Sequence, residues 1–390
     1  MVATENRSHP TSDNDIIEFV MRVLFINSVC GIRSTGRIVT DLADVYMADG
    51  HQCKIAYGRE NAPAEYMDIA YRIGTDTSVK INALKTRIFD NDAFCAKGAT
   101  KRLIEFADNY DPDLLWLHNL HGYYINIELL FEWIKSRPQM EVRWTLHDCW
   151  AFTGHCAHFS AIGCEGWRSG CGDCPQKGEY PKSIVFDNSK SNYARKKNAF
   201  LGVNNMTLVT PSHWLADLVK QSFLGAYPTE VVHNTIDVDV FVPTKGDFRE
   251  RHGLGKTFVV LGVASAWSEK KGLSDFVRLS LLLGEGFRVV LVGLTKKQIK
   301  TMPHGILCIE RTNSKKELAE IYTAADAFVN LTYEDTYPTV NLEATACGTP
   351  CITYRTGGSV ESVPEENVAE QGDVEAVARM LKGMKADKSQ

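Results

Sequence analysis

The stretch that decides the fold is residues 326–354, DAFVNLTYEDTYPTVNLEATACGTPCITY. Two short apolar runs at its ends, 326–330 and 350–354, have the composition of buried strands, and a helical pattern lies between them. A strand, a crossover helix and a second strand form the unit from which parallel sheets are built. The segment therefore predicts an α/β fold with parallel strands.

The same alternation continues along the chain in two series. The first has expected strands at 22–27, 52–57, 113–118, 141–146 and 206–210, with helical patterns such as 36–49 and 124–136. The second has expected strands at 257–264, 287–292, 305–309, 326–330 and 350–354, with helices near 271–284, 314–324 and 338–346. A polar stretch with proline and glycine, 241–246, separates the series and suits a linker. We predict two parallel-sheet, nucleotide-fold-sized domains that face each other across a ligand-binding cleft.

Composition places the chain among ordinary globular proteins. It has 390 residues, of which 44% are hydrophobic and 23% charged, and a net charge of -5. This balance excludes whole-chain disorder and argues against a nucleic-acid partner. No apolar run approaches the roughly 18 residues that a bilayer helix needs, and the first twenty residues lack the apolar core of a signal peptide. We expect a cytoplasmic protein with a disordered tail over residues 1–20.

The start of the helix expected at 338–346 has the spacing of a site for phosphate and ribose. Pro338 suits the first turn, and the amides of Thr339 and Val340 are expected to point at the cleft, where they would bind phosphate. Glu343 lies on the same helical face as Thr339 and can accept hydrogen bonds from a ribose diol. The spacing is equally compatible with a plain strand–loop–helix that carries an exposed glutamate.

Two further segments offer groups to a ligand. Lys271 opens a helix after a strand and is placed to neutralise a diphosphate, although a solvated lysine is the simple alternative. Gly31 and Gly36 join the first strand to a helix, where backbone can approach a ligand closely. A P-loop reading of these glycines fails, because Arg37 and Ile38 stand where that motif needs lysine and a hydroxyl residue.

Polar side chains follow two neighbouring strands of the first series. His118 and His121 come at the end of one strand, and His147 and Asp148 directly after the next. Carboxyl ends of parallel strands meet at one edge of a sheet, so we expect these groups at the cleft. An isolated histidine is often structural, yet several at adjacent strand ends favour a functional role.

Cysteines cluster in the segment 149–175, which we interpret as an insertion. Cys156, Cys164, Cys171 and Cys174 follow the spacing C-x7-C-x6-C-x2-C. In a cytosolic chain such a cluster favours metal ligands, and four thiolates suit a structural zinc ion. A disulfide and simply reduced thiols remain the alternatives.

Several of these segments resemble family 4 retaining glycosyltransferases of the GT-B fold. Asp335 and Glu343 bracket seven residues, like the acids of that family's Glu-x7-Glu region, of which the first approaches the donor sugar and the second binds the ribose. Aspartate stands in place of the first glutamate, for which Glu334 beside it could compensate. His147 and Asp148 resemble its His-Asp position beside the donor sugar and acceptor, and Arg311 its loop beside the nucleobase. The string HDCWAFTGHC and the cysteines after it are similar to the colanic-acid and exopolysaccharide subset.

The resemblance implies two Rossmann-like domains, an acceptor-side domain over 21–240 and a nucleotide-sugar-binding domain over 241–390. It implies a retaining, hexosyl-type transfer from a UDP- or GDP-sugar to a saccharide or lipid-linked oligosaccharide, in capsular or exopolysaccharide synthesis and without a catalytic cofactor. The implied catalytic residues are His147, Asp148 and Asp335. The implied donor-binding residues are Gly31, Gly36, Lys271, Arg311, Thr339, Val340 and Glu343. The alternative is a non-catalytic sugar-nucleotide-binding protein, which would share every phosphate-binding feature.

A basic stretch in the first domain bears on where the protein works. Its members are Lys80, Lys85, Arg87, Lys97, Lys101 and Arg102. The ordinary explanation is a solvated face. The functional one is attraction to anionic lipid headgroups, which fits a lipid-linked acceptor and a peripheral position at the inner face of the cell membrane.

Overall fold

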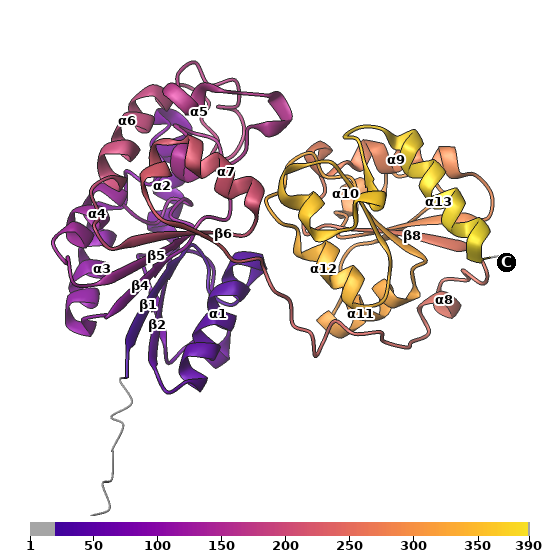
Figure 1. Cartoon of the computed structure of the whole chain (residues 1–390), viewed down its shortest axis with the longest axis horizontal. Coiled ribbons are helices and arrows are strands. Elements are labelled where there is room, and N and C mark those ends of the chain that lie inside the picture. Colours follow the sequence, from indigo (N-terminus) through magenta and orange to yellow (C-terminus); the bar gives the residue numbers. More distant parts are fainter. Residues whose placement is uncertain (1–19, 389–390) are drawn as a thin grey trace, which may run out of the picture.

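The computed structural model describes residues 20–388, and these form two lobes side by side (Figure 1). Each lobe is built on its own parallel sheet, so the predicted α/β class and the pair of parallel-sheet units are confirmed. Apart from Val20, the tail predicted over residues 1–20 lies outside the described part of the chain.

The N-terminal lobe holds a seven-stranded sheet in the order β3-β2-β1-β4-β5-β6-β7. Every neighbouring pair is parallel. The strands are β1 (Arg22–Asn27), β2 (Gln52–Tyr57), β3 (Ala70–Arg72), β4 (Leu114–Leu117), β5 (Glu141–Thr145), β6 (Met206–Thr210) and β7 (Thr229–Val231). The helices are α1 (Arg33–Ala48), α2 (Asp76–Phe89), α3 (Lys97–Tyr110), α4 (Ile127–Lys135), α5 (Gly166–Ser169), α6 (Ser189–Phe200) and α7 (His213–Gln221).

The C-terminal lobe holds a six-stranded sheet in the order β10-β9-β8-β11-β12-β13. Its strands are β8 (Phe258–Val263), β9 (Phe287–Val292), β10 (Ile306–Ile309), β11 (Ala327–Asn330), β12 (Cys351–Tyr354) and β13 (Val368–Ala369). Its helices are α8 (Phe248–Arg251), α9 (Leu273–Leu283), α10 (Lys296–Ile299), α11 (Lys315–Ala324), α12 (Thr339–Ala346) and α13 (Val374–Lys388). In Figure 1, α13 runs alongside α9 at the outer side of this lobe.

The central strands are apolar because helices cover both faces of each sheet. β4 is buried at all four positions and β8 at five of six. Side chains of β1, β2 and β4 fill the cores of the N-terminal lobe, whereas β8, β9 and β11 fill those of the other. The carboxyl ends of both sets of strands carry the polar loops described below.

The segment between β7 and α8 connects the lobes and contains the predicted linker 241–246. The first residue of the predicted linker, Phe241, is buried in the core of the C-terminal lobe against Tyr322, at 6.3 Å between ring centroids. The linker therefore starts as part of that lobe. Within residues 20–388, no helix combines the length and apolarity that crossing a bilayer requires.

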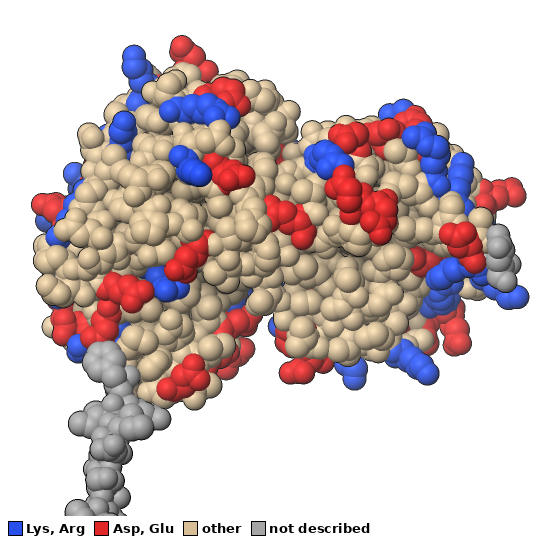
Figure 2. Space-filling view, in the orientation of Figure 1, with Lys and Arg blue, Asp and Glu red and all other residues tan. Residues whose placement is uncertain are grey.

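Charged side chains of both signs alternate over the face drawn in Figure 2, without a large patch of one sign. A nucleic-acid-binding face needs concentrated positive charge. That the protein has no nucleic-acid partner remains a prediction. The face in Figure 2 shows no concentration of positive charge that would contradict it.

Candidate active site

The loop 331–338 and the start of α12 form the first part of the site. The loop runs from β11 to Pro338 and is anchored to the other loops of the lobe, since Tyr333 N donates to the Lys270 carbonyl at 2.8 Å. α12 begins at Thr339, one residue later than predicted, with Pro338 at the N-cap and no side-chain cap there. The first-turn amides of a helix have no acceptors within the helix, so those of Thr339 and Val340 suit an anion.

Two lysine–carboxylate pairs line this loop. Lys271 Nζ lies 2.8 Å from Asp335 Oδ2 and 3.3 Å from the Thr332 hydroxyl. Lys270 Nζ lies 2.8 Å from Glu334 Oε2. The structure thus brings the predicted Lys271 and Asp335 together, as an ion pair and not as separate groups.

Glu334 is the more enclosed of the two acids, with its side chain 3% exposed against 20% for Asp335. Its Oε1 atom is buried and has no hydrogen-bond partner among the described residues. A buried acceptor of this kind usually has a donor from water or a ligand. Glu334 can therefore accept a hydrogen bond from a hydroxyl group of a bound molecule.

Glu343 is buried, which differs from the exposed glutamate of the simple helix interpretation. Its Oε2 accepts a hydrogen bond from the Tyr322 hydroxyl at 2.9 Å. Burial raises the pKa of Glu343, and the charges of Arg37 and Lys315 act in the opposite direction. The charge of Arg37, on α1 of the N-terminal lobe, thus acts across the lobe boundary on the residue predicted to bind ribose.

The predicted histidines of the N-terminal lobe meet at the ends of β4 and β5. His118 Nδ1 and His147 Nε2 lie 3.0 Å apart, and the two rings stack at 5.2 Å. His121 Nε2 lies 2.8 Å from Asp148 Oδ2, and its other ring nitrogen contacts the Tyr180 hydroxyl at 2.8 Å. The result is a chain of polar contacts that fixes the carboxylate of Asp148.

Burial and neighbouring charge set the protonation of this group. Burial lowers the pKa of His147 to about 4, although the charge of Asp148 opposes the shift. Burial alone would raise the pKa of Asp148. The charge and hydrogen bond of His121, with the charge of His158 and the Trp150 amide, outweigh it and lower that pKa to about 2. At neutral pH the site therefore presents a neutral imidazole beside an ionised carboxylate.

The two lobes contact each other at these residues. The Thr336 hydroxyl donates to the His147 carbonyl at 2.9 Å. Lys270 Nζ donates to Gln176 Oε1 at 2.9 Å, and thereby links the Glu334 pair to the N-terminal lobe. The loop before α12 and the strand end that carries His147 are thus joined directly.

Gly31 and Gly36 lie at the start of α1, on the opposite lobe from Lys271. Gly31 has a positive φ of +66°, and its amide donates to the Gly36 carbonyl at 3.0 Å. A Cβ atom at Gly31 would lie 2.7 Å from Pro63 Cγ, so both the dihedral angle and the space require glycine. Arg311, the predicted base-side residue, is exposed in the loop between β10 and α11.

The four predicted metal ligands surround one small cavity. Cys156, Cys164, Cys171 and Cys174 all line it, and all are free thiols. In the described part of the chain, one set of three metal-type ligand atoms lies within 4.8 Å of one another, that of His213, His233 and Glu361. No three of the four cysteine sulfurs meet this distance among the described residues, so the zinc site stays a prediction.

The sequence did not predict the residues that form hydrogen bonds with the predicted site residues and so fix their positions. Tyr322 lies on α11, 21 residues before Glu343, and Tyr180 lies 32 residues after Asp148 within an irregular loop. No local pattern connects such pairs, because only the tertiary fold brings them together. Arg37 was noted only as the residue that excludes a P-loop, whereas its charge acts on Glu343.

Comparison with known proteins agrees with this geometry. Residues 256–387 match the family model described as glycosyl transferases group 1. The putative colanic acid biosynthesis glycosyl transferase WcaC of Escherichia coli K12 is 27% identical over 285 residues, which cover 70% of this chain and 67% of that protein.

Solved structures share the architecture. Sucrose-phosphate synthase from Thermosynechococcus elongatus superposes with a TM-score of 0.68 at 14% identity, over 95% of this chain and 90% of that one. Anabaena Alr3699/HepE in complex with UDP gives 0.63 at 15% identity, over 94% and 91%. The chain therefore has the two-sheet GT-B fold, and its residues 256–387 are similar to the glycosyl transferases group 1.

Proposed function

We propose that the protein transfers a hexose from a nucleoside-diphosphate sugar to a saccharide acceptor with retention of configuration. The observation that carries this proposal is the contact between the loop before α12 and the strand end that carries His147. There the Thr336 hydroxyl donates to the His147 carbonyl at 2.9 Å. Ionised Asp148 and buried Glu334 thereby belong to loops that meet at the lobe boundary. The similarity to WcaC supports polysaccharide assembly, of capsule or exopolysaccharide, as the setting.

The residues divide the work between leaving group and sugar. The α12 amides and Lys271 stabilise the departing diphosphate, an electrostatic contribution that transfer of this kind depends on. Lys271 is paired with Asp335, so an incoming diphosphate shares or displaces that carboxylate. The unpartnered Glu334 Oε1 supplies an acceptor for a sugar hydroxyl, the role that the resemblance gave to Asp335.

Retention follows from the resemblance and fixes the bond changes. The bond between the anomeric carbon and the phosphate oxygen breaks, and the acceptor oxygen bonds to the same face of that carbon. The departing phosphate oxygen takes the acceptor's proton. Asp148, held by His121, is placed to orient the acceptor or the sugar through hydroxyl hydrogen bonds.

Nucleotide release and product stereochemistry test the proposal together. We expect nucleoside diphosphate to appear only when donor and saccharide acceptor are both present, and the product's anomeric NMR coupling to match that of the donor. Asp148→Asn should lower the rate on the order of 10²-fold, and Asp68→Asn at the surface should leave it unchanged. Tight donor binding without nucleotide release across an acceptor panel would instead support the sugar-nucleotide-binding protein.

The donor we propose is a UDP-hexose. Anabaena Alr3699/HepE, which shares the fold, is solved in complex with UDP and with UDP-glucose. A thermal-shift panel of UDP-, GDP- and ADP-sugars checks this, because a ligand that binds only the folded state raises the melting temperature. A larger shift with GDP-sugars than with UDP-sugars would contradict it.

The acceptor we propose is lipid-linked, which requires a face that meets a membrane. The six basic residues predicted for this role, on α2 and α3, are all exposed. Exposed apolar side chains lie among them on α2, namely Ile81, Leu84 and Phe89. Exposed Phe186 stacks on Phe89 at 5.8 Å, and continues the apolar surface. Basic and apolar groups together suit an anionic lipid surface.

Vesicle co-sedimentation tests this face. We expect binding to vesicles with anionic headgroups at low salt and weaker binding to neutral ones. Leu84→Asp with Phe89→Asp should abolish it, whereas Leu281→Asp, at an exposed apolar residue on α9, should not. Equal binding by both variants would overturn the assignment of this face without affecting the proposed transfer reaction.

A further inference from the structure

The loop between β5 and α6 has little regular structure for its length. Over residues 146–188, the structure has two short 3-10 turns, Trp150–Phe152 and Ser160–Ile162, and the four-residue α5. A segment with so few backbone hydrogen-bond ladders needs another source of order. Its cysteines surround a cavity of about 30 Å³, which is closed on one side by the stacked rings of Phe159 and Trp167.

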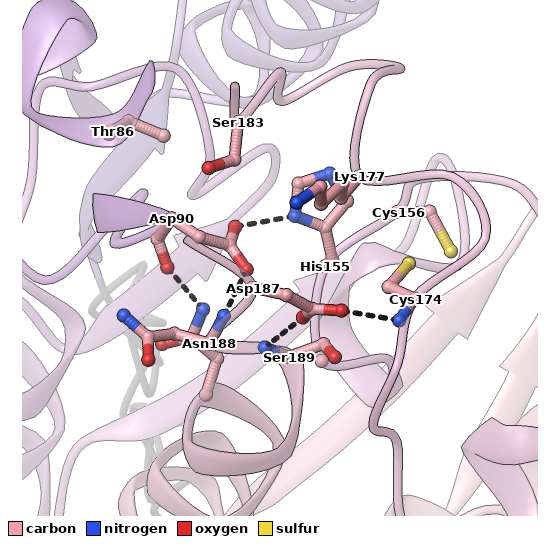
Figure 3. Close-up of polar contacts among 12 residues, drawn as sticks. Thr86, Asp90, His155, Cys156, Cys174, Lys177, Ser183, Asp187, Asn188 and Ser189 are labelled. Carbon is pink, nitrogen blue, oxygen red and sulfur yellow. Dashed lines mark hydrogen bonds and ion pairs between the residues drawn. The ribbon is translucent and has the colours of Figure 1, made fainter. Parts of the chain in front are cut away.

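Two of the thiols lie next to each other in this cavity. Cys156 and Cys174 interact electrostatically, and Figure 3 shows their sulfur atoms side by side. Cys171 Sγ accepts a hydrogen bond from the Gly154 amide at 3.1 Å. The thiolate is the form that binds metal, and a sulfur that accepts from an amide keeps this hydrogen bond when it does so.

Buried basic groups lie next to the thiols. Lys196 is fully buried, donates to the carbonyls of Trp150 and Thr153, and lies within electrostatic reach of Cys171 and Cys156. His155 lines the cavity, with one ring nitrogen held by Asp90 (Figure 3) and its buried Nε2 without a partner among the described residues. Zinc with four thiolates carries a net negative charge, which the protonated forms of these two side chains would offset.

We propose that Cys156, Cys164, Cys171 and Cys174 bind one zinc-type ion that holds this loop in place beside the candidate active site. Four sulfur ligands select a soft ion such as zinc over magnesium or calcium. Zinc–sulfur bonds of about 2.3 Å would draw the four sulfurs closer together than they lie in this structure. The cavity between them gives the room for that movement.

The cysteine-containing loop also contacts residues of the candidate active site. Gln176, two residues after Cys174, accepts from Lys270 of the other lobe, which is paired with Glu334. Tyr180 contacts His121, which holds Asp148. An ion at Cys174 therefore fixes the loop that supplies both contacts. This second part of the proposal rests on the proposed transfer function, whereas metal binding does not.

Metal content tests the ion itself. Protein purified under reducing conditions without chelators should contain about one zinc ion per chain. Cys156→Ser, Cys164→Ser and Cys174→Ser should each lose most of it, whereas Cys308→Ser, at a half-buried cysteine outside the loop, should keep it. Cobalt exchange should give the near-ultraviolet sulfur-to-cobalt bands of a thiolate site. Wild-type protein without zinc and without such bands after cobalt exchange would overturn the proposal.

The His213, His233 and Glu361 set gives a second control. His233→Ala should leave zinc content and the sulfur-to-cobalt bands unchanged. Loss of the ion in this variant and not in the cysteine variants would assign the metal to that set and contradict the proposal. If the cysteine variants fail to fold, removal of the ion from wild-type protein with a chelator, followed by reloading, gives the same comparison through melting temperature.

Tyr180→Phe separates the loop's effect on turnover from the binding of the ion. It should keep the zinc content, lower kcat several-fold and leave donor affinity unchanged, because it removes only the contact to His121. Unchanged kcat would overturn the coupling. Normal zinc content in a protein without transfer activity on any donor would instead refute the proposed function and leave the metal site standing.

Discussion

At the scale of single residues, most charged side chains of the candidate active site are paired with a group of opposite charge or a hydrogen-bond partner. Lys271 is paired with Asp335, and Lys270 with Glu334. The carboxylate of Asp148 is held by His121, while His147 is kept neutral by burial. A diphosphate would therefore exchange one set of ion pairs for another, which keeps the buried charge balanced in both states.

The lowered pKa of His147 gives a pH-dependent stability. The imidazole has a pKa of about 4 in the folded protein and about 6.5 unfolded. The stability that it contributes is thus fully present above pH 6.5 and is lost as the pH falls toward 4. The loss should be roughly 2–3 kcal/mol. Denaturant unfolding from pH 7 to 4 should show a shallower decline for His147→Asn than for wild type.

His304→Asn is the matched control, because His304 is exposed on the other lobe. It should follow the wild-type decline with pH. A His147→Asn protein with the full wild-type decline would show that this imidazole is not kept neutral by its surroundings.

Glu343 should control donor affinity. Glu343→Gln keeps an oxygen for the Tyr322 hydroxyl but removes the charge, and a charged hydrogen bond contributes about 1.5–3 kcal/mol. UDP should therefore bind at least about tenfold more weakly at pH 7.5. Because burial raises the pKa of Glu343, wild-type affinity should fall on acidification at a higher pH than an ordinary glutamate would give.

Calorimetric titrations with UDP between pH 5.5 and 8 measure both effects. The Glu343→Gln variant should lose that part of the pH dependence, and Glu366→Gln, at an exposed glutamate, should behave as wild type. Equal affinities for Glu343→Gln and wild type would remove the ribose role.

At the scale of elements, the sequence predicts those whose pattern is long enough to read. β1 and β9 occupy the predicted residues, and α12 begins one residue later than predicted. The missed strands β3, β7 and β13 have only two or three residues each, too few for a periodic pattern. They lie at the sheet edges and exist because a neighbouring strand offers hydrogen bonds.

The candidate site was predictable to the same extent. Residues next to strand ends and helix starts, such as His147 and Thr339, lie where the pattern places them. Their partners were not predictable, because Tyr180 and Tyr322 reach the site from other elements. The insertion was visible only as a cysteine spacing, since hydrogen bonds across an irregular loop leave no repeat in the sequence.

Gly154 tests how closely the insertion packs on α6. A Cβ atom there would lie 2.1 Å from the Ser189 carbonyl oxygen and 2.8 Å from Cys171 Cβ. Backbone cannot yield as a flexible side chain would, so Gly154→Ala should cost about 1–3 kcal/mol of stability. Thermal unfolding measures it, and Gly178→Ala, with open space at its Cβ, should change little. Equal melting temperatures would mean that the loop moves freely on α6.

At the scale of the whole molecule, the lobes are joined by a few specific contacts besides the connecting segment. Glu361 of the C-terminal lobe accepts from the amides of His213 and Trp214 at the start of α7, both at 2.8 Å. Within the connecting segment itself, Asn234 Nδ2 donates to the Tyr337 carbonyl at 3.0 Å. Gly358 lies so close that a Cβ atom would be 2.6 Å from Ser212 Cβ. The interface is therefore built on side chains that mostly bind backbone groups of the other lobe, with little room at Gly358.

Glu361 should set how firmly the lobes hold together. Its carboxylate satisfies two orphan amides and faces the positive end of the α7 dipole, so Glu361→Ala should cost about 1–2 kcal/mol of lobe–lobe contact. The two lobes should then unfold at separate temperatures in calorimetry, and the radius of gyration from X-ray scattering should rise. Glu361→Gln, which retains one acceptor oxygen, should fall between, whereas Glu366→Ala, at an exposed glutamate nearby, should match wild type. A single calorimetric transition and an unchanged radius in Glu361→Ala would show that the remaining contacts hold the lobes without this cap.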